Sequence, residues 1–215
     1  MNRLFLWFVK VTGYLIAVFY YRKKIYYVNK KESNKKIKGK AIIVSNHTSV
    51  WDYPLYMFTF FARTLRVLTA ELMFAKSKWM GWFLKKLGCI KVDRDSQDFS
   101  FMNESIDALN KGQVVLVFPE ARVPRPHEND LLEFKPSFVY IALETGAPII
   151  PVYTNGSYLK KERAKVVIGE KIYLQDLYDE ARTEKENIAQ LCEYVKNSIR
   201  VLRDKLNEEE QKKEK

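Results

Sequence analysis

Histidine and cysteine are scarce in this 215-residue chain, which has two of each. Cys89 and Cys192 lie far apart and show no paired spacing, so the sequence implies neither a disulfide framework nor a thiolate metal cluster, and it indicates a reducing compartment. Gly-x-x-x-x-Gly-Lys, Gly-x-Gly-x-x-Gly and His-Glu-x-x-His motifs are missing as well. Phosphate-loop, dinucleotide-binding and zinc-protease chemistries therefore lack support, and no metal is expected.

Repeats, low-complexity linkers and internal breaks are also missing, and 215 residues suit one domain with a core of its own. A hydrophobic fraction of 47% excludes a disordered chain. The formal net charge of +11 predicts an anionic partner, either nucleic acid or an anionic membrane surface.

An apolar segment opens the chain. Residues 4–21 are apolar apart from Lys10, Thr12 and Gly13, and no small-residue cleavage site follows them, which argues against a removed signal peptide. The length approaches the roughly 20 residues that cross a bilayer, but Lys10 near the middle costs about 2.5–3.5 kcal/mol on insertion. A spanning helix and an interfacial helix both remain open. Aromatic and basic ends disfavour a buried core helix, so residues 1–24 are expected to anchor the chain in a membrane.

Nine basic residues crowd positions 22–40, where Glu32 is the single acid. Such a cluster beside an apolar helix favours contact with an anionic leaflet and places this side in the cytoplasm. It explains the positive charge without nucleic acid, for which no motif is present, although part of the stretch fits a solvated linker.

From residue 41 onward, predicted strands alternate with predicted helices. Strands are expected near 41–45, 65–69, 89–93, 113–118, 148–153 and 165–173, and helices near 53–62, 72–87, 98–111, 134–145 and 184–206. This order predicts an α/β domain over residues 25–206, with a mixed, largely parallel central sheet covered by helices. The charged residues 207–215 are expected to form a disordered tail.

Two tryptophans, Trp79 and Trp82, stand among four lysines between residues 74 and 86. Tryptophan and lysine together suit the headgroup region of a bilayer, so this stretch is either a second membrane contact or a core helix with exposed lysines.

His47 follows the apolar run at 41–44, which places it at the mouth of the predicted sheet, and Asp52 comes five residues later. Histidine exchanges protons near neutral pH, and a nearby carboxylate can fix its tautomer, so the pair suggests a general base with its orienting partner. Ser49 could in principle act as a nucleophile, but no Gly-x-Ser-x-Gly elbow is present, and a helix-capping role is favoured.

Four segments occur in a fixed order: Asn46-His47-Thr48-Ser49-Val50-Trp51-Asp52, Gly88 to Arg94, Phe118-Pro119-Glu120-Ala121-Arg122, and Ala147 to Val152. Their order and character resemble the glycerolipid acyltransferase family, in particular its 1-acyl-sn-glycerol-3-phosphate acyltransferases. The signatures of that family are Asn-His-x4-Asp, a Gly-x-x-x-x-Asp-Arg-like segment, Phe-Pro-Glu-Gly and a late proline-bearing strand. The resemblance covers roughly residues 40 to 155.

The resemblance implies a membrane-associated enzyme that transfers a fatty acyl group from acyl-CoA or acyl carrier protein to the free sn-2 hydroxyl of lysophosphatidate. The product is phosphatidate, the transfer is direct, and no cofactor is needed beyond the donor. His47 is then the base and Asp52 its partner. Alternatives are glycerol 3-phosphate or another lysolipid as the acceptor, or a degenerate relative that only binds membranes.

The family motifs also assign the site for the acceptor's phosphate. They imply roles for Arg94, Glu120 and Arg122, and Lys135 is a further candidate contact; Glu120 could instead orient a neighbouring group. The chain departs from the family at Ala121, where relatives have glycine. If that backbone needs a positive φ, alanine is penalised there and the acceptor pocket differs.

Overall fold

The computed structural model describes residues 1–29, 33–93, 98–125, 127–128, 130–158 and 163–214. Its helices are α1 (Arg3–Tyr21), α2 (Asp52–Thr59), α3 (Glu71–Ala75), α4 (Lys78–Leu87), α5 (Ser100–Asn110), α6 (Ser137–Thr145) and α7 (Glu184–Glu214), with a short 3-10 helix at Leu174–Leu177. Its strands are β1 (Lys24–Tyr27), β2 (Ala41–Ser45), β3 (Leu65–Ala70), β4 (Ile90–Val92), β5 (Val114–Val117), β6 (Ile149–Thr154) and β7 (Lys165–Ile168).

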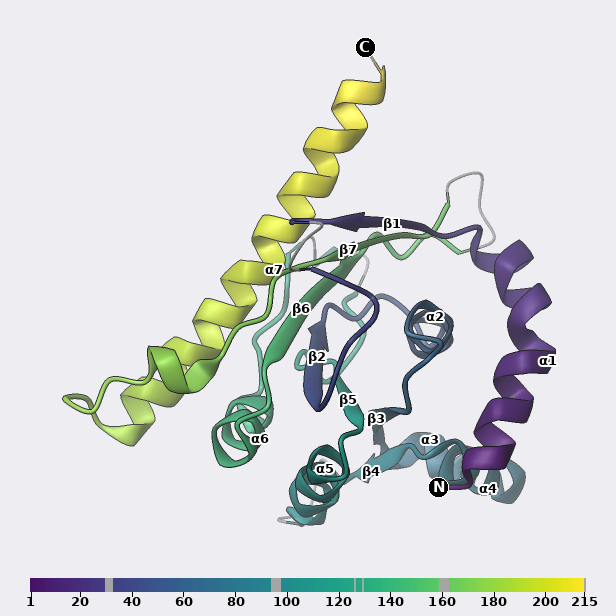
Figure 1. Ribbon diagram of the computed structural model, residues 1–215, viewed down its shortest axis with the longest axis horizontal. Helices are drawn as coiled ribbons and strands as arrows, with labels where there is room; N and C mark the ends of the chain where they lie inside the picture. Colours follow the sequence, from purple (N-terminus) through teal and green to yellow (C-terminus); the bar gives the residue numbers. More distant parts are fainter. Residues whose placement is uncertain (30–32, 94–97, 126, 129, 159–162, 215) are drawn as a thin grey trace.

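These strands form one sheet in the order β1-β7-β6-β2-β5-β3-β4. Neighbouring strands run parallel, except that β6 and β7 are antiparallel. The predicted mixed, largely parallel sheet is confirmed. Because β2, β3, β4, β5 and β6 point the same way, the residues that follow them gather at one edge of the sheet (Figure 1).

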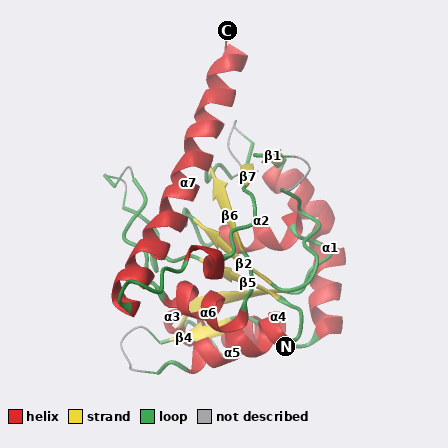
Figure 2. Ribbon diagram, turned by 60° about the vertical axis from the view of Figure 1, so that its left-hand side comes forward, coloured by secondary structure: helices red, strands yellow, loops and turns green. Residues whose placement is uncertain are grey.

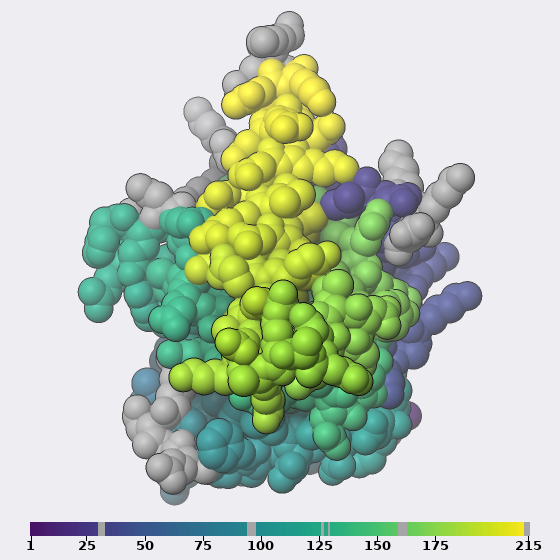
Figure 3. Space-filling model, turned by 90° about the vertical axis from the view of Figure 1, so that its left-hand side faces the viewer, coloured from purple at the N-terminus to yellow at the C-terminus, as the bar shows by residue number. Residues whose placement is uncertain are grey.

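Side chains alternate between the two faces of the sheet, and each face has its own apolar core. Ala41 and Ile43 of β2 pack in a cluster with residues of α1, α2 and α4, whereas Ile42 and Val44 pack in a second cluster with residues of α5, α6 and α7. Helices therefore cover both faces, as Figure 2 shows. The long helix α7 spreads over the outer surface of the second face (Figure 3).

Helix α1 packs along the domain rather than standing apart from it. Leu6, Lys10, Ala17 and Tyr21 are buried, and this spacing of three to four residues defines one face of a helix. The Lys10 ammonium donates hydrogen bonds to the carbonyl oxygens of Phe61 at 2.8 Å and Arg63 at 2.6 Å. Lys10, whose charge disfavours insertion into a membrane, therefore points into the protein.

The opposite face of α1 is apolar and exposed. Its exposed large apolar side chains are Leu4, Trp7, Phe8, Val11, Tyr14, Leu15, Ile16, Val18 and Phe19. By length and composition alone, α1 could cross a membrane, and 22% of its apolar window is buried against the rest of the chain.

The structure departs from the predicted elements in three places. Strand β1 lies within the basic stretch and was not predicted, because its four residues are surrounded by lysines. It pairs with β7. The single helix expected at 72–87 is divided, because the Ser77 side chain accepts a hydrogen bond from the Met80 N–H and starts α4. The boundary placed at 207, beyond which disorder was expected, falls inside α7, which is helical to Glu214.

Candidate active site

A largely apolar cavity of about 790 Å³ opens at the carboxyl edge of the sheet. Residues from the ends of β2, β3, β4 and β5 line it, together with the first turns of α5 and α6. Its polar lining includes His47, Asp93, Asp98, Lys135 and Ser137. The volume lies within the range of small-molecule sites, and few polar groups face a mostly hydrocarbon wall.

His47 and Asp52 meet at this edge, as their spacing predicted. Nδ1 of His47 lies 2.8 Å from Oδ2 of Asp52, whose side chain is fully buried. A carboxylate at this position holds the proton on Nδ1, so Nε2 carries the lone pair that can take a proton. The His47 ring stacks on Phe118, with ring centroids 4.4 Å apart and planes inclined by 19°. Two contacts therefore hold the imidazole: Asp52 at Nδ1 and the Phe118 ring on one face.

Asp52 accepts several further hydrogen bonds. The backbone N–H groups of Thr48 and Ser49 donate to Oδ2 at 2.6 and 3.0 Å. The hydroxyl groups of Thr48 and Tyr158 donate to Oδ1. Sequence reasoning missed Tyr158, which lies 106 residues beyond Asp52 and belongs to none of the recognised motifs. Ser49 does not cap α2 directly, because its hydroxyl accepts from the N–H of Trp51, just before the helix.

Glu120 lies behind His47 rather than in the cavity. Its Oε1 accepts the backbone N–H of His47 at 2.8 Å, and its Oε2 accepts that of Leu132 at 2.9 Å. Burial raises the pKa of Glu120, although these two N–H groups oppose the shift. The orienting role left open by the sequence fits this geometry, since Glu120 fixes the backbone from which the candidate base projects.

Two of the three predicted phosphate-binding cations, Arg122 and Lys135, lie among the described residues, and their surroundings differ. Arg94 lies outside the described residues. Arg122 is exposed and forms a two-pronged ion pair with Glu128, with Nη to Oε distances of 2.7 and 2.6 Å. This pairing and a hydrogen bond from the Arg125 N–H lower the pKa of Glu128 to about 2. Lys135 lines the cavity. The structure therefore brings Lys135, but not Arg122, to the cavity that His47 faces.

Ala121 adopts a left-handed conformation with φ of 58° and lines the same cavity. This is the backbone geometry that glycine tolerates and alanine resists. The departure from the family motif thus falls at a strained position beside the candidate site.

Trp79 and Trp82 are exposed on α4, which packs beside α1. The ring of Trp82 meets that of Phe5 edge-on at 5.5 Å, and the Asn2 N–H donates to the Lys86 carbonyl oxygen at 3.1 Å. The two tryptophans are therefore exposed rather than buried in the core, and Trp82 contacts α1 through Phe5.

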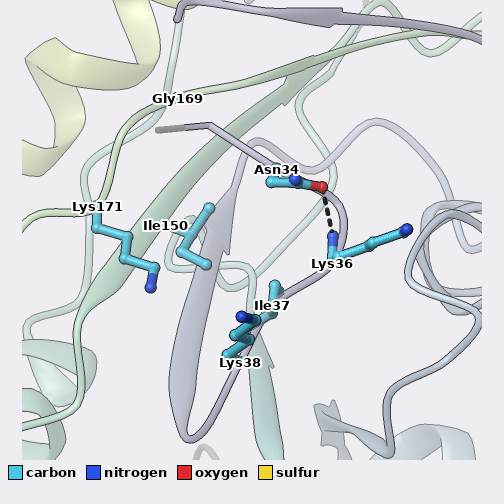
Figure 4. A pocket seen from close by; sticks show the side chains of 7 residues that line it. All are labelled: Asn34, Lys36, Ile37, Lys38, Ile150, Gly169 and Lys171. Atoms are coloured by element: carbon cyan, nitrogen blue, oxygen red, sulfur yellow. Dashed lines mark hydrogen bonds between the residues drawn. The ribbon is translucent and has the colours of Figure 1, made fainter. Parts of the chain in front are cut away.

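A second hollow of about 110 Å³ lies near the start of β2, at the other end of this strand from His47 (Figure 4). Asn34, Lys36, Ile37, Lys38, Ile150, Gly169 and Lys171 line it. Neither a histidine nor a carboxylate is among these residues, whereas the larger cavity is lined by His47, which pairs with Asp52, so the candidate base belongs to the larger cavity. Among the residues that the structure describes, no three His, Cys, Asp or Glu side chains gather as metal ligands.

A comparison with models of known protein families assigns this chain to a family. The family model described as Acyltransferase matches residues 24–155. The protein therefore belongs to the Acyltransferase family.

Individual relatives agree with this assignment. The 1-acyl-sn-glycerol-3-phosphate acyltransferase of Bacillus subtilis is 30% identical over 138 residues, which cover 62% of this chain and 66% of that protein. Human 1-acyl-sn-glycerol-3-phosphate acyltransferase alpha is 31% identical over 57% of this chain and 44% of its own length. Taffazin of Dictyostelium discoideum is 30% identical over 163 residues, which cover 66% of this chain and 54% of that protein. The matches thus span between 44% and 66% of these relatives.

The crystal structure of the 1-acyl-sn-glycerophosphate (LPA) acyltransferase PlsC from Thermotoga maritima superposes with a TM-score of 0.62. The match covers 92% of this chain and 79% of that chain at 23% identity. At this identity, the superposition establishes a common fold.

Proposed function

We propose that this protein is an acyltransferase that moves a fatty acyl group from acyl-CoA or acyl carrier protein to the sn-2 hydroxyl of lysophosphatidate. The observation that carries the proposal is the His47–Asp52 pair, whose histidine lines a largely apolar cavity of about 790 Å³. The family and the names of three relatives support it. Phosphatidate and a free thiol would be the products.

In this mechanism, Nε2 of His47 takes the proton of the acceptor hydroxyl while Asp52 holds the Nδ1 proton. The alkoxide oxygen attacks the thioester carbonyl carbon, the carbon–sulfur bond breaks, and the thiolate receives the proton from His47. A base of this kind contributes about 10²–10⁴-fold to the rate. The fatty chain lies in the apolar cavity, and Lys135 attracts the acceptor's phosphate.

The chain offers a matched control for the base, because its other histidine, His127, is exposed. His47→Ala and Asp52→Asn should abolish acceptor-dependent thiol release, and His127→Ala should retain it. The assay measures thiol release from acyl-CoA and from acyl carrier protein, each with lysophosphatidate, glycerol 3-phosphate or another lysolipid as the acceptor. Wild-type turnover in His47→Ala would contradict the mechanism, and no turnover with any acceptor in a folded protein would favour a degenerate membrane-binding relative.

The exposed face of α1, together with Trp79 and Trp82 of α4, is proposed to lie in the membrane interface with the active site toward the cytoplasm. The domain covers one side of α1 along its length, which favours a helix lying in the surface over a spanning one. Phe8→Glu with Ile16→Glu should release the protein from anionic vesicles in a flotation assay. Val201→Glu on α7, on the opposite side of the sheet, is the control, and equal release by both variants would contradict the proposal.

A further inference from the structure

Tyr158 reaches the buried carboxylate of Asp52 from a distant part of the chain. Its hydroxyl donates to Oδ1, where the Thr48 hydroxyl also donates at 2.7 Å. Oδ2, the oxygen that faces His47, receives two backbone N–H groups instead. Tyr158 and Thr48 are therefore the side chains that fix the far oxygen of Asp52 and, with it, the rotation of the carboxylate about its Cβ–Cγ bond.

The segment that carries Tyr158 is anchored where it leaves β6. At Thr154, the last residue of β6, the backbone exchanges two hydrogen bonds with the Asn46 amide. Farther on, Oδ1 of Asn155 accepts the N–H groups of Ser157 at 3.3 Å and Lys165 at 2.8 Å. The Asn46 bonds hold the start of this segment against the end of β2, and the Asn155 bonds tie it to Ser157 and to the first residue of β7.

Gly156 lets this segment approach Thr48 closely. Its φ is +67°, and a Cβ atom there would stand 2.7 Å from Oγ1 and 2.8 Å from Cβ of Thr48. Any larger residue would lift the segment away from Asp52.

The phenol of Tyr158 is a permanent donor. Burial and the Asp52 charge raise its pKa far above the ordinary value, so the proton stays on the hydroxyl at working pH. The Tyr158 ring meets the ring of Tyr21 edge-on at 5.5 Å, and the Tyr21 hydroxyl donates to the carbonyl oxygen of Trp51 at 3.0 Å. The last residue of α1 thus supports both Tyr158 and the chain next to Asp52.

We propose that Tyr158 is a positioning residue for the reaction: by holding Oδ1 of Asp52, it keeps Oδ2 on the Nδ1 proton of His47 and so leaves Nε2 free as the base. The inference rests on the proposed function. Without the phenol hydroxyl, Asp52 rotates more freely, and part of the His47 population carries its proton on Nε2, where it cannot accept one from the acceptor.

The two histidines make the tautomer directly measurable in the full-length protein in detergent micelles. With nitrogen-15 in histidine alone, neutral His47 should show one Nδ1–H tautomer in the wild type, and Tyr158→Phe should show a mixture. The exposed His127 is the internal reference, and Tyr153→Phe on β6 is the control variant. In the acyl-transfer assay, kcat should fall about tenfold with KM unchanged, the factor expected when one hydrogen bond to a charged group is lost.

Gly156→Ala tests the same contact by a second route, because it lifts Tyr158 without altering the phenol, and it should produce the same mixed tautomer. An unchanged His47 tautomer in folded Tyr158→Phe overturns the inference, whatever happens to kcat. The spectrum needs no turnover, so this result is distinct from failure of the proposed function, which would appear as wild-type protein that releases no thiol with any acceptor.

Discussion

The side-chain amide of Asn46 exchanges two hydrogen bonds of 2.9 Å with the backbone N–H and carbonyl oxygen of Thr154. Asn46 is buried, so Asn46→Ala leaves both backbone groups without these partners and should lower the free energy of unfolding by about 2–4 kcal/mol. Acyl transfer should fall as well, because the segment after Thr154 loosens.

Asn46→Asp sharpens this prediction, since the carboxylate can accept from the Thr154 N–H but places an oxygen against the Thr154 carbonyl. It should be at least as unstable as the alanine variant. Asn110→Ala, at an exposed helix end, should change stability by less than about 0.5 kcal/mol. Urea unfolding measures the free energy of unfolding of the three variants. If Asn46→Asp were as stable as the wild type, the Asn46 amide would not have the role given to it here.

Glu120→Gln should destabilise the fold by about 1–3 kcal/mol at neutral pH, because its NH₂ group faces a backbone N–H of His47 or Leu132 that needs an acceptor. Glu144→Gln, exposed on α6, is the control.

The same carboxyl predicts a pH dependence. The pKa of Glu120 is raised by burial, so the folded state binds this proton more tightly than the unfolded state does. Its contribution to stability therefore decreases as pH rises from the unfolded value of 4.5 through the raised folded value. The stability advantage of the wild type over Glu120→Gln should shrink over this window in denaturant titrations. An advantage that grows with pH would show that the amide hydrogen bonds outweigh burial.

Ala121→Gly should stabilise the protein by about 0.5–1 kcal/mol, since relief of a left-handed alanine exceeds the extra unfolded-chain entropy of glycine. Ala189→Gly, on the exposed face of α7, should have the opposite sign and a similar size. Thermal or urea unfolding compares the two. Destabilisation by both substitutions would mean that Ala121 carries no strain.

Lys10→Met should cost about 1–3 kcal/mol, because the carbonyl oxygens of Phe61 and Arg63 lose their buried donor. The substitution makes α1 more apolar, so a helix held by hydrophobicity alone would gain stability instead. Lys85→Met on α4, where the lysine is exposed, is the control for added apolar surface. Unfolding in detergent micelles distinguishes the two outcomes.

Lys135→Met should raise KM for lysophosphatidate about tenfold, the effect of losing one charged contact with a phosphate. Arg122→Met should have a smaller effect, because Glu128 already engages its guanidinium. Lys171→Met, beside the second hollow, should leave KM unchanged. A larger effect at Arg122 would indicate that this arginine exchanges Glu128 for substrate.

The alternation of apolar strands with helical stretches was enough to predict the sheet class from the sequence, because the buried parallel strands contain continuous apolar runs, such as 41–44 and 114–117. The His47–Asp52 pair was also predictable, since five residues across a strand end and the start of a helix bring the two side chains together. Strand β1 was not, because its four residues lie in a basic stretch and pair with a strand about 140 residues later.

Local patterns thus determined the elements of this protein, its apolar first helix and the residues of its candidate base. Tertiary structure alone decided which way Lys10 points, that Glu120 holds the backbone of His47, and that Arg122 is paired with Glu128. It alone brought Tyr158 to Asp52 across 106 residues. The physical reason is that a parallel sheet collects the ends of distant strands at one edge, and no pattern within a single segment records which side chains meet there.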